Sequence, residues 1–260
     1  MRIAALQFEA KAGAVGRNLG RIIEAAAAAA KGGAELLIAP ELCLPGYGAG
    51  DGFGSLAEPL DGPLVARIQD TCRKTGVAIV TGFCERAGSE IANSALFLDG
   101  RRAVVYRKAF LYGDYEKHHF MPGSPENVIV EHGGLRIGML ICYDVEFPEN
   151  VRRLAAAGVD LVAVPTALPK TPHAGFIAGS IVPVRAFENQ LHIAYADLCG
   201  HDGRFAYAGL STIAAPDGRT LASAGSGEEL LFAHIDPAAF DASRAENPYL
   251  SDLEAVMGKR

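Results

Sequence analysis

The sequence opens with MRIAALQFEAKAGAVGRNLGRIIEAAAAAAKGGAELLIAP, residues 1–40, and this stretch decides the fold class. Residues 2–8 are an alternating apolar run that is typical of a strand. Residues 15–31 predict a helix, because they include six successive alanines and are followed by a Gly-Gly stop at 32–33. Residues 35–39 predict a second, short strand that ends at Pro40. A strand, a helix and a strand in this order favour a parallel pair with a right-handed crossover, so we expect an α/β fold.

The rest of the chain mixes hairpins with further strand–helix–strand units. We expect strands at 77–85, 91–98, 101–107, 128–131, 135–141, 160–164, 191–196, 210–215 and 220–223. We expect helices at 148–157, at 177–189 and at 62–74, the last with Asp61 as its N-cap. Asp-Gly pairs at 99–100 and 217–218 and the His-Gly-Gly at 132–134 are read as hairpin turns. We therefore expect one mixed-sheet domain over residues 1–260, with two packed sheets and helices outside. The segment from Asp236 is expected to be an irregular tail that packs on a neighbour.

Composition excludes several classes of protein. Half of the 260 residues are hydrophobic, which is too apolar for a disordered chain. The net charge is −6 and no basic block is present, so neither nucleic acid nor an anionic membrane is an expected partner. No apolar stretch approaches the ~20 residues that a bilayer requires, and the N-terminus does not resemble a signal peptide. The cysteines are an odd and sparse set, at Cys43, Cys72, Cys84, Cys142 and Cys199. They do not look like a disulfide framework, so we expect free thiols and a cytoplasmic protein.

Three residues that carry chemistry follow predicted strands. In α/β folds, sites lie just past the carboxyl ends of strands, and Glu41, Lys108 and Cys142 occupy such places. A thiol at a strand-to-helix junction lies near helix N–H groups that favour the thiolate, and the Tyr143 N–H would point toward an oxyanion. A partly desolvated Glu41 would have a raised pKa suited to a general base, and a lysine beside the cysteine would lower the thiol pKa. Glu116 would orient that lysine or bind a substrate N–H. Taken singly, each residue also fits a structural role: a buried cysteine, a loop acid or a surface lysine.

Taken together, these residues lie in blocks that resemble the nitrilase, or carbon–nitrogen hydrolase, superfamily. The matching blocks run the length of the chain and are AALQF (4–8), PELCLPGY (40–47), YRK (106–108), LICYDVEFPE (140–149) and RAFEN (185–189). The resemblance implies a Glu–Lys–Cys triad of Glu41, Lys108 and Cys142, with Glu116 as the second glutamate of amidase members. It also implies a four-layer αββα sandwich, usually a homodimer that joins through helices.

The mechanism implied by the resemblance needs no metal or organic cofactor. Glu41 takes the proton of Cys142, and the thiolate attacks the carbonyl carbon of an amide. Lys108 and the Tyr143 backbone N–H hold the oxyanion, and Glu41 protonates the departing ammonia. Water then hydrolyses the thioester.

The residues around the cysteine favour one branch of the superfamily. Tyr143–Asp144 resembles amidases and carbamoylases, whereas true nitrilases usually carry Trp-Glu there, and this chain has no tryptophan. The compact length looks most like bacterial amidases that act on small linear aliphatic amides. N-carbamoyl amino acid, ureido-acid and omega-amide hydrolysis stay open as alternatives. Matching blocks place the following residues near the substrate: Tyr47, Tyr143, Phe147, Thr166 and Ala167. Arg185 is interpreted as structural, with a substrate clamp as the alternative.

Other patterns are given less weight. The histidines match no metal-binding spacing, and the adjacent His118 and His119 are expected to point apart, so no metal site is predicted. Alternate glycines at 46–54 fit no phosphate-loop register and are interpreted as a mobile loop beside the site, a candidate lid. Two other function classes stay open. One is a Cys–His hydrolase or transferase that uses His118, His119 or His173 as base, and the other is a catalytically dead binding protein on the same fold.

Overall fold

Two mixed sheets form the centre of the computed structural model, which describes residues 1–258. Within these residues each sheet has six strands, in the orders β12-β1-β2-β3-β4-β5 and β11-β10-β9-β8-β7-β6. The first sheet contains β1 (Arg2–Gln7), β2 (Leu36–Ile38), β3 (Ala78–Ala87), β4 (Glu90–Leu98), β5 (Ala103–Arg107) and β12 (Glu229–His234). The second contains β6 (Ile129–His132), β7 (Leu135–Met139), β8 (Leu161–Thr166), β9 (His192–Asp197), β10 (Thr212–Ala214) and β11 (Thr220–Ser223).

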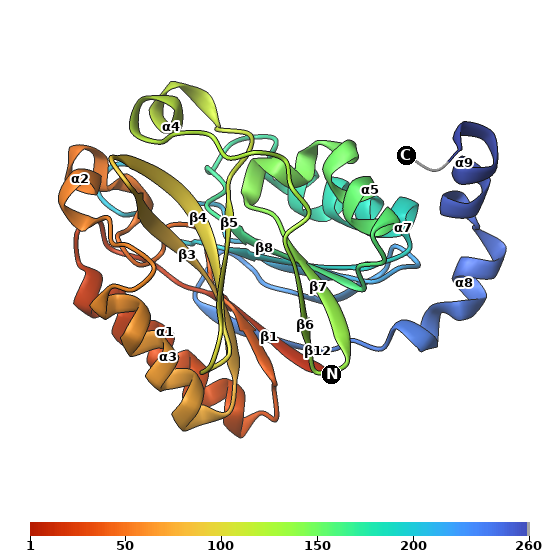
Figure 1. The fold of residues 1–260 in the computed structure, drawn as a ribbon, viewed down its shortest axis with the longest axis horizontal. Helices are drawn as coiled ribbons and strands as arrows, with labels where there is room; N and C mark the ends of the chain where they lie inside the picture. The colour runs from red at the N-terminus through yellow and green to blue at the C-terminus, as the bar shows by residue number, and fades with distance from the viewer. Residues whose placement is uncertain (259–260) are drawn as a thin grey trace.

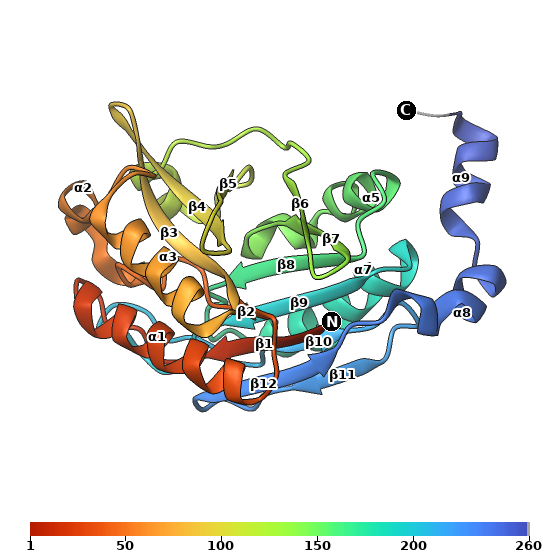
Figure 2. The ribbon, with the colours of Figure 1, turned by 60° about the horizontal axis from the view of Figure 1, so that its bottom comes forward.

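Helices cover the outer faces of the two sheets (Figures 1 and 2). α1 (Val15–Lys31) and α3 (Pro63–Thr75) lie on the first sheet, and α5 (Pro148–Ala156) and α7 (Val182–Asn189) lie on the second. The period-2 alternation of β1 shows why: Ile3 and Ala5 enter the core between the sheets, and Ala4 and Leu6 enter the core beneath the helices. The expected four-layer αββα sandwich is confirmed.

The parallel centres of both sheets follow from the crossovers. β1, β2 and β3 are parallel, with Ala4 opposite Leu37 and Leu37 opposite Ile79. β7, β8 and β9 are parallel as well, with Gly138 opposite Val162 and Val162 opposite Ile193. Parallel neighbours bring their carboxyl ends to the same edge, so the loops after β2 and β7 meet at one end of the sandwich.

Most predicted elements are present, and the differences are local. The three hairpins pair antiparallel, and α1 has the predicted bounds. Asp61 is not the N-cap of α3, because Gly62 holds that position directly before Pro63. The helix expected at 177–189 is α7, preceded by a π turn, η3 (Ile177–Ile181), and by α6 (Ala174–Phe176). β12 was not predicted from the sequence.

The segment from Asp236 is helical, so the expectation of an irregular tail is wrong. It forms η4 (Pro237–Phe240), α8 (Asp241–Glu246) and α9 (Tyr249–Met257). α8 and α9 stand apart from the sandwich (Figure 1), and Tyr249 contacts Phe187 of α7 with ring centroids 5.7 Å apart. Among residues 1–258, no helix combines the length and the apolar character that crossing a membrane requires.

Candidate active site

Glu41, Lys108 and Cys142 come together at the end of the sandwich where β2, β5 and β7 finish. The Lys108 Nζ donates to Glu41 Oε1 and to Glu116 Oε1, both at 2.7 Å. All four side chains are buried, and Cys142 and Glu116 open onto a common cavity. Three positions that are far apart in the sequence therefore form one polar cluster in an apolar setting.

The loop after β2 presents Glu41 in a tight turn. Leu42 has a positive φ of 45°, and the Glu41 N–H donates to the Thr166 carbonyl at 3.3 Å, which ties the turn to the second sheet. Gly82 on β3 allows this approach, because a Cβ there would lie 2.1 Å from the Leu42 nitrogen. Asn93 Nδ2 donates to Glu41 Oε1 at 2.7 Å. The other carboxylate oxygen, Oε2, is buried and has no hydrogen-bond partner among residues 1–258.

Cys142 is the first residue of η2 (Cys142–Glu146), at a sharp turn after β7. Its φ of 45° is rare for a residue with a side chain and marks a strained backbone. Asp144 holds this turn in place, because its carboxylate accepts from the N–H of Ile141 at 3.1 Å, the Tyr106 hydroxyl at 2.9 Å and the N–H of Phe110 at 2.9 Å. The same carboxylate thus fixes the cysteine and the segment that carries Lys108. Tyr143 lies in the first turn of η2, where backbone N–H groups have no helical partner.

α4 (Gly113–His119) supplies Glu116 to the cluster. Its Oε1 accepts from Lys108 and also from the Tyr47 hydroxyl at 2.7 Å, and its Oε2 accepts from the Tyr112 N–H at 2.8 Å. Tyr47 begins η1 (Tyr47–Gly52), which precedes α2 (Phe53–Leu56). The glycines at 46–54 therefore lie largely in short helices rather than in an irregular loop, and the Gly50 N–H donates to the Tyr115 hydroxyl at 3.0 Å.

Burial and charge set the protonation of the acid and the lysine. Burial raises the pKa of Glu41 to about 7, with Lys108 acting in the opposite direction and Glu116 adding to the rise. Burial alone would lower the pKa of Lys108, but the carboxylates of Glu41 and Glu116 outweigh it and hold that pKa well above its usual value. Lys108 therefore stays a cation, while Glu41 can give and take a proton near neutral pH.

The thiol of Cys142 differs from the expectation. Burial, followed by the nearby Glu41 carboxylate, raises its pKa well above the usual value. Lys108 does lower this pKa, as expected, but its effect is smaller than that of burial. The expected lowering of this pKa by the helix terminus and the lysine is therefore outweighed by burial, and the thiol is neutral at rest, as a mechanism in which Glu41 takes its proton requires.

The cavity beside Cys142 has a volume of about 350 Å³. Of the predicted substrate-contacting residues, Tyr47, Tyr143 and Ala167 line it. Phe147 and Thr166 are not among the lining residues. Phe147 stacks on Phe110, with centroids 4.1 Å apart, and contacts Tyr143 edge-on, whereas Thr166 is fully buried and acts through its carbonyl on Glu41.

Several residues that contribute to the site were not identified in the sequence analysis. Asn93 is a polar residue inside the apolar strand run IANSALF, and this break in the pattern is the one signal that pointed to it. Glu146 lines the cavity, and burial raises its pKa. The apolar wall is made of residues that the sequence did not mark, namely Leu168, Pro169, Phe176, Ile177 and Ile181.

Arg185 has a structural position. It donates to the carbonyls of Val145 at 3.2 Å and Glu146 at 2.7 Å, at the end of η2, and it pairs with Glu188. It does not line the cavity, which favours the structural interpretation over the substrate clamp.

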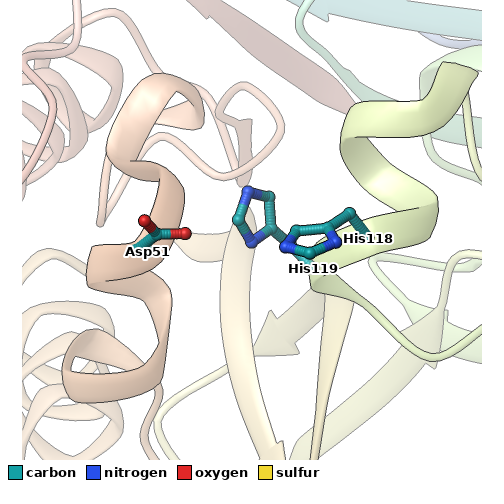
Figure 3. A group of neighbouring side chains, drawn as sticks. All are labelled: Asp51, His118 and His119. Atoms are coloured by element: carbon teal, nitrogen blue, oxygen red, sulfur yellow. The ribbon is translucent and has the colours of Figure 1, made fainter.

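The histidines are dispersed. His173 lines the cavity, whereas His118 and His119 lie at the end of α4 outside it. The expectation that these two rings point apart is wrong, because their centroids are 4.8 Å apart (Figure 3). Neighbours on a helix differ by only about 100° around the axis, so long adjacent side chains can converge.

Comparison with known proteins places this site in context. A model of the Carbon-nitrogen hydrolase family matches residues 2–245. The chain is 43% identical to "Hydrolase in pqqF 5'region" of Pseudomonas protegens, over 97% of this chain and 88% of the relative. It is 33% identical to an (R)-stereoselective amidase of Pseudomonas sp., over 99% of this chain and 93% of that protein. Among solved structures, NitN amidase from Nesterenkonia sp. AN1 matches with a TM-score of 0.88 and 35% identity, covering 99% of this chain and 98% of that one.

Proposed function

The chain belongs to the carbon–nitrogen hydrolase family, and on that premise we propose that it hydrolyses small linear aliphatic carboxamides to a carboxylic acid and ammonia. One observation carries the proposal. A buried lysine lies between two carboxylates beside a neutral thiol, at an otherwise largely apolar cavity. The amidase relatives support the reaction class.

The first half of the reaction forms a thioester. Glu41 Oε2 has no hydrogen-bond partner within residues 1–258, so it accepts the Cys142 proton as the sulfur attacks the amide carbon. The carbonyl oxygen becomes an oxyanion, which the Lys108 ammonium and the Tyr143 N–H stabilise. Glu41 then returns the proton to the amide nitrogen, the C–N bond breaks and ammonia leaves. Glu116 positions Lys108 and accepts a hydrogen bond from the substrate N–H.

The second half releases the acid. Glu41 takes a proton from water, the hydroxide adds to the thioester carbon, and the C–S bond breaks as the proton returns to Cys142. The reaction as written uses only these side chains and water.

The cavity walls support a neutral aliphatic substrate. No lysine or arginine of residues 1–258 lines the cavity, whose charged lining groups are Glu116 and Glu146. A substrate with a free carboxylate, such as a ureido acid or an omega-amide, would meet these acids without a cationic partner. The Nesterenkonia amidase has been crystallised with butyramide, which agrees with this class of substrate.

The test is a substrate panel read by ammonia release. We expect acetamide, propionamide and butyramide to be hydrolysed faster than succinamate, N-carbamoyl amino acids and nitriles. Mass spectrometry of the enzyme during turnover should find an acyl adduct on Cys142. The proposal fails if the carboxylate-bearing compounds are the better substrates or if Cys142→Ala keeps its activity.

Two further variants separate this mechanism from a Cys–His enzyme. Glu41→Gln should lose nearly all activity, whereas His173→Gln, at the cavity lining, should keep most of it. The opposite result would assign the base to His173.

A further inference from the structure

Asp51, His118 and His119 form a cluster on the surface beside the site (Figure 3). Asp51 lies in η1, and the two histidines are the last residues of α4. One ligand atom from each side chain lies within 4.8 Å of the others. None of the three residues lines the cavity, so the cluster is separate from the amide-binding space.

The cluster has one fixed member and two adjustable ones. His119 is half-buried, and its ring packs edge-on against Phe53 at 5.6 Å and Tyr115 at 4.8 Å between centroids. Asp51 and His118 are exposed. Within the described part of the chain, none of the three side chains makes a hydrogen bond or ion pair, so their ligand atoms are available.

We propose that this cluster binds a divalent transition-metal ion of the Zn²⁺, Ni²⁺ or Co²⁺ class, with water completing the coordination. Two imidazoles and one carboxylate are ligands that such ions accept, whereas Mg²⁺ and Ca²⁺ prefer oxygen alone. Bonds of about 2.0–2.1 Å place tetrahedral ligand atoms about 3.3 Å apart. The ligand atoms of the cluster lie up to 4.8 Å apart, and rotation of the Asp51 and His118 side chains toward the fixed His119 would bring them to this shorter spacing.

A metal here would connect two segments that also meet at the catalytic cluster. η1 and α4 are already joined by the Tyr47 hydroxyl on Glu116 at 2.7 Å and by the Tyr115 hydroxyl on the Tyr47 carbonyl at 2.7 Å. An ion held by Asp51 and the His pair adds a further connection between the same segments. Metal binding therefore stabilises the wall that holds Glu116, without occupying the cavity.

The experiment is calorimetric titration of untagged, chelator-treated protein with NiCl₂, in a Cys142→Ala background that removes the active-site thiol as a competing ligand. We expect one saturable site and a rise in melting temperature on adding Ni²⁺. Asp51→Asn, His118→Gln and His119→Gln should each weaken binding by about tenfold or more, since even partners outside the ligand set cost 10- to 100-fold. The matched control is His234→Gln, an exposed histidine on β12, which should bind as its parent does.

Two results would overturn the proposal. One is the absence of saturable Ni²⁺ binding below millimolar concentration. The other is unchanged affinity in the Asp51→Asn and His118→Gln variants. These two exposed positions decide the question even if His119→Gln, which alters an aromatic contact, fails to fold.

Discussion

Asn93 offers a direct test of Glu41 as the base. Its Nδ2 donates to Glu41 Oε1 at 2.7 Å, and both side chains are buried. Asn93→Leu removes the donor at nearly constant volume, while Lys108 keeps its own 2.7 Å contact with the same oxygen. The site therefore stays assembled and loses one interaction that favours the ionised carboxylate.

The size of the effect follows from the hydrogen bond. A hydrogen bond to a charged group contributes about 1.5–3 kcal/mol, and about 1.4 kcal/mol corresponds to one pH unit of titration. Burial has already raised the pKa of Glu41 to about 7, and losing the Asn93 donor raises it further. Because the base must be ionised to accept the thiol proton, the acid limb of the kcat/KM profile should move upward by about 1–2 pH units.

The assay is ammonia release from butyramide between pH 5 and 10, compared with Ser94→Ala as the matched control. Ser94 neighbours Asn93 on β4 and donates to the buried carboxylate of Glu85 at 2.8 Å, outside the site. The control loses a similar buried donor, so it should lose stability but keep the acid limb in place. An acid limb that stays fixed in Asn93→Leu, or that moves equally in both variants, would refute the assignment of the limb to Glu41.

Three further variants probe other parts of the molecule. His192→Phe should abolish an acid-induced loss of about 2.4 kcal/mol in the free energy of unfolding, measured by urea titration at pH 7 and 4.5. Burial lowers the pKa of His192 to about 4, so below pH 6.5 the unfolded chain takes up a proton that the folded chain does not, and stability falls as the pH falls. Gly82→Ala should cost about 3 kcal/mol, seen as a lower melting temperature, because its Cβ would lie 2.1 Å from the Leu42 nitrogen. Tyr47→Phe removes the donor to Glu116 and should reduce kcat/KM by about tenfold or more, a loss of activity that Ser94→Ala, which also loses a buried donor to a carboxylate, should not show.

Local patterns were sufficient to predict much of the fold. The alanine run fixed α1, and turn residues fixed the three hairpins, because each depends on interactions within a few residues. β12 was missed for the opposite reason. Its partner is β1, where Ile3 lies opposite Ala233, and no local pattern indicates a pairing across most of the chain. The α3 cap was wrong by one residue because Asp61 and Gly62 both suit that position, and Pro63 at the first turn favoured Gly62.

Some residues of the candidate site could likewise be predicted from local sequence patterns, and others could not. Strand ends pointed to Glu41, Lys108 and Cys142, since parallel strands bring their carboxyl ends together. Asp144 and Asn93 could not be assigned, because their roles come from hydrogen bonds between separate elements of the fold. The direction of the Cys142 pKa shift could not be predicted for a related reason. The local argument counted a helix terminus and a lysine, but burial and the neighbouring Glu41 decide the pKa, and both are properties of the assembled fold.

That protonation state constrains how the proposed reaction can proceed. At rest the thiol is neutral, while Lys108 is a cation held by Glu41 and Glu116. Moving the proton from Cys142 to Glu41 as the sulfur attacks shifts one negative charge from the carboxylate to the oxyanion, and the net charge of the site does not change. In a buried setting, a free thiolate formed beforehand would place a third anion next to two carboxylates, which the low polarity makes costly. Proton transfer coupled to attack avoids that state, and the raised pKa values of both Cys142 and Glu41 therefore favour general-base catalysis over a pre-formed thiolate.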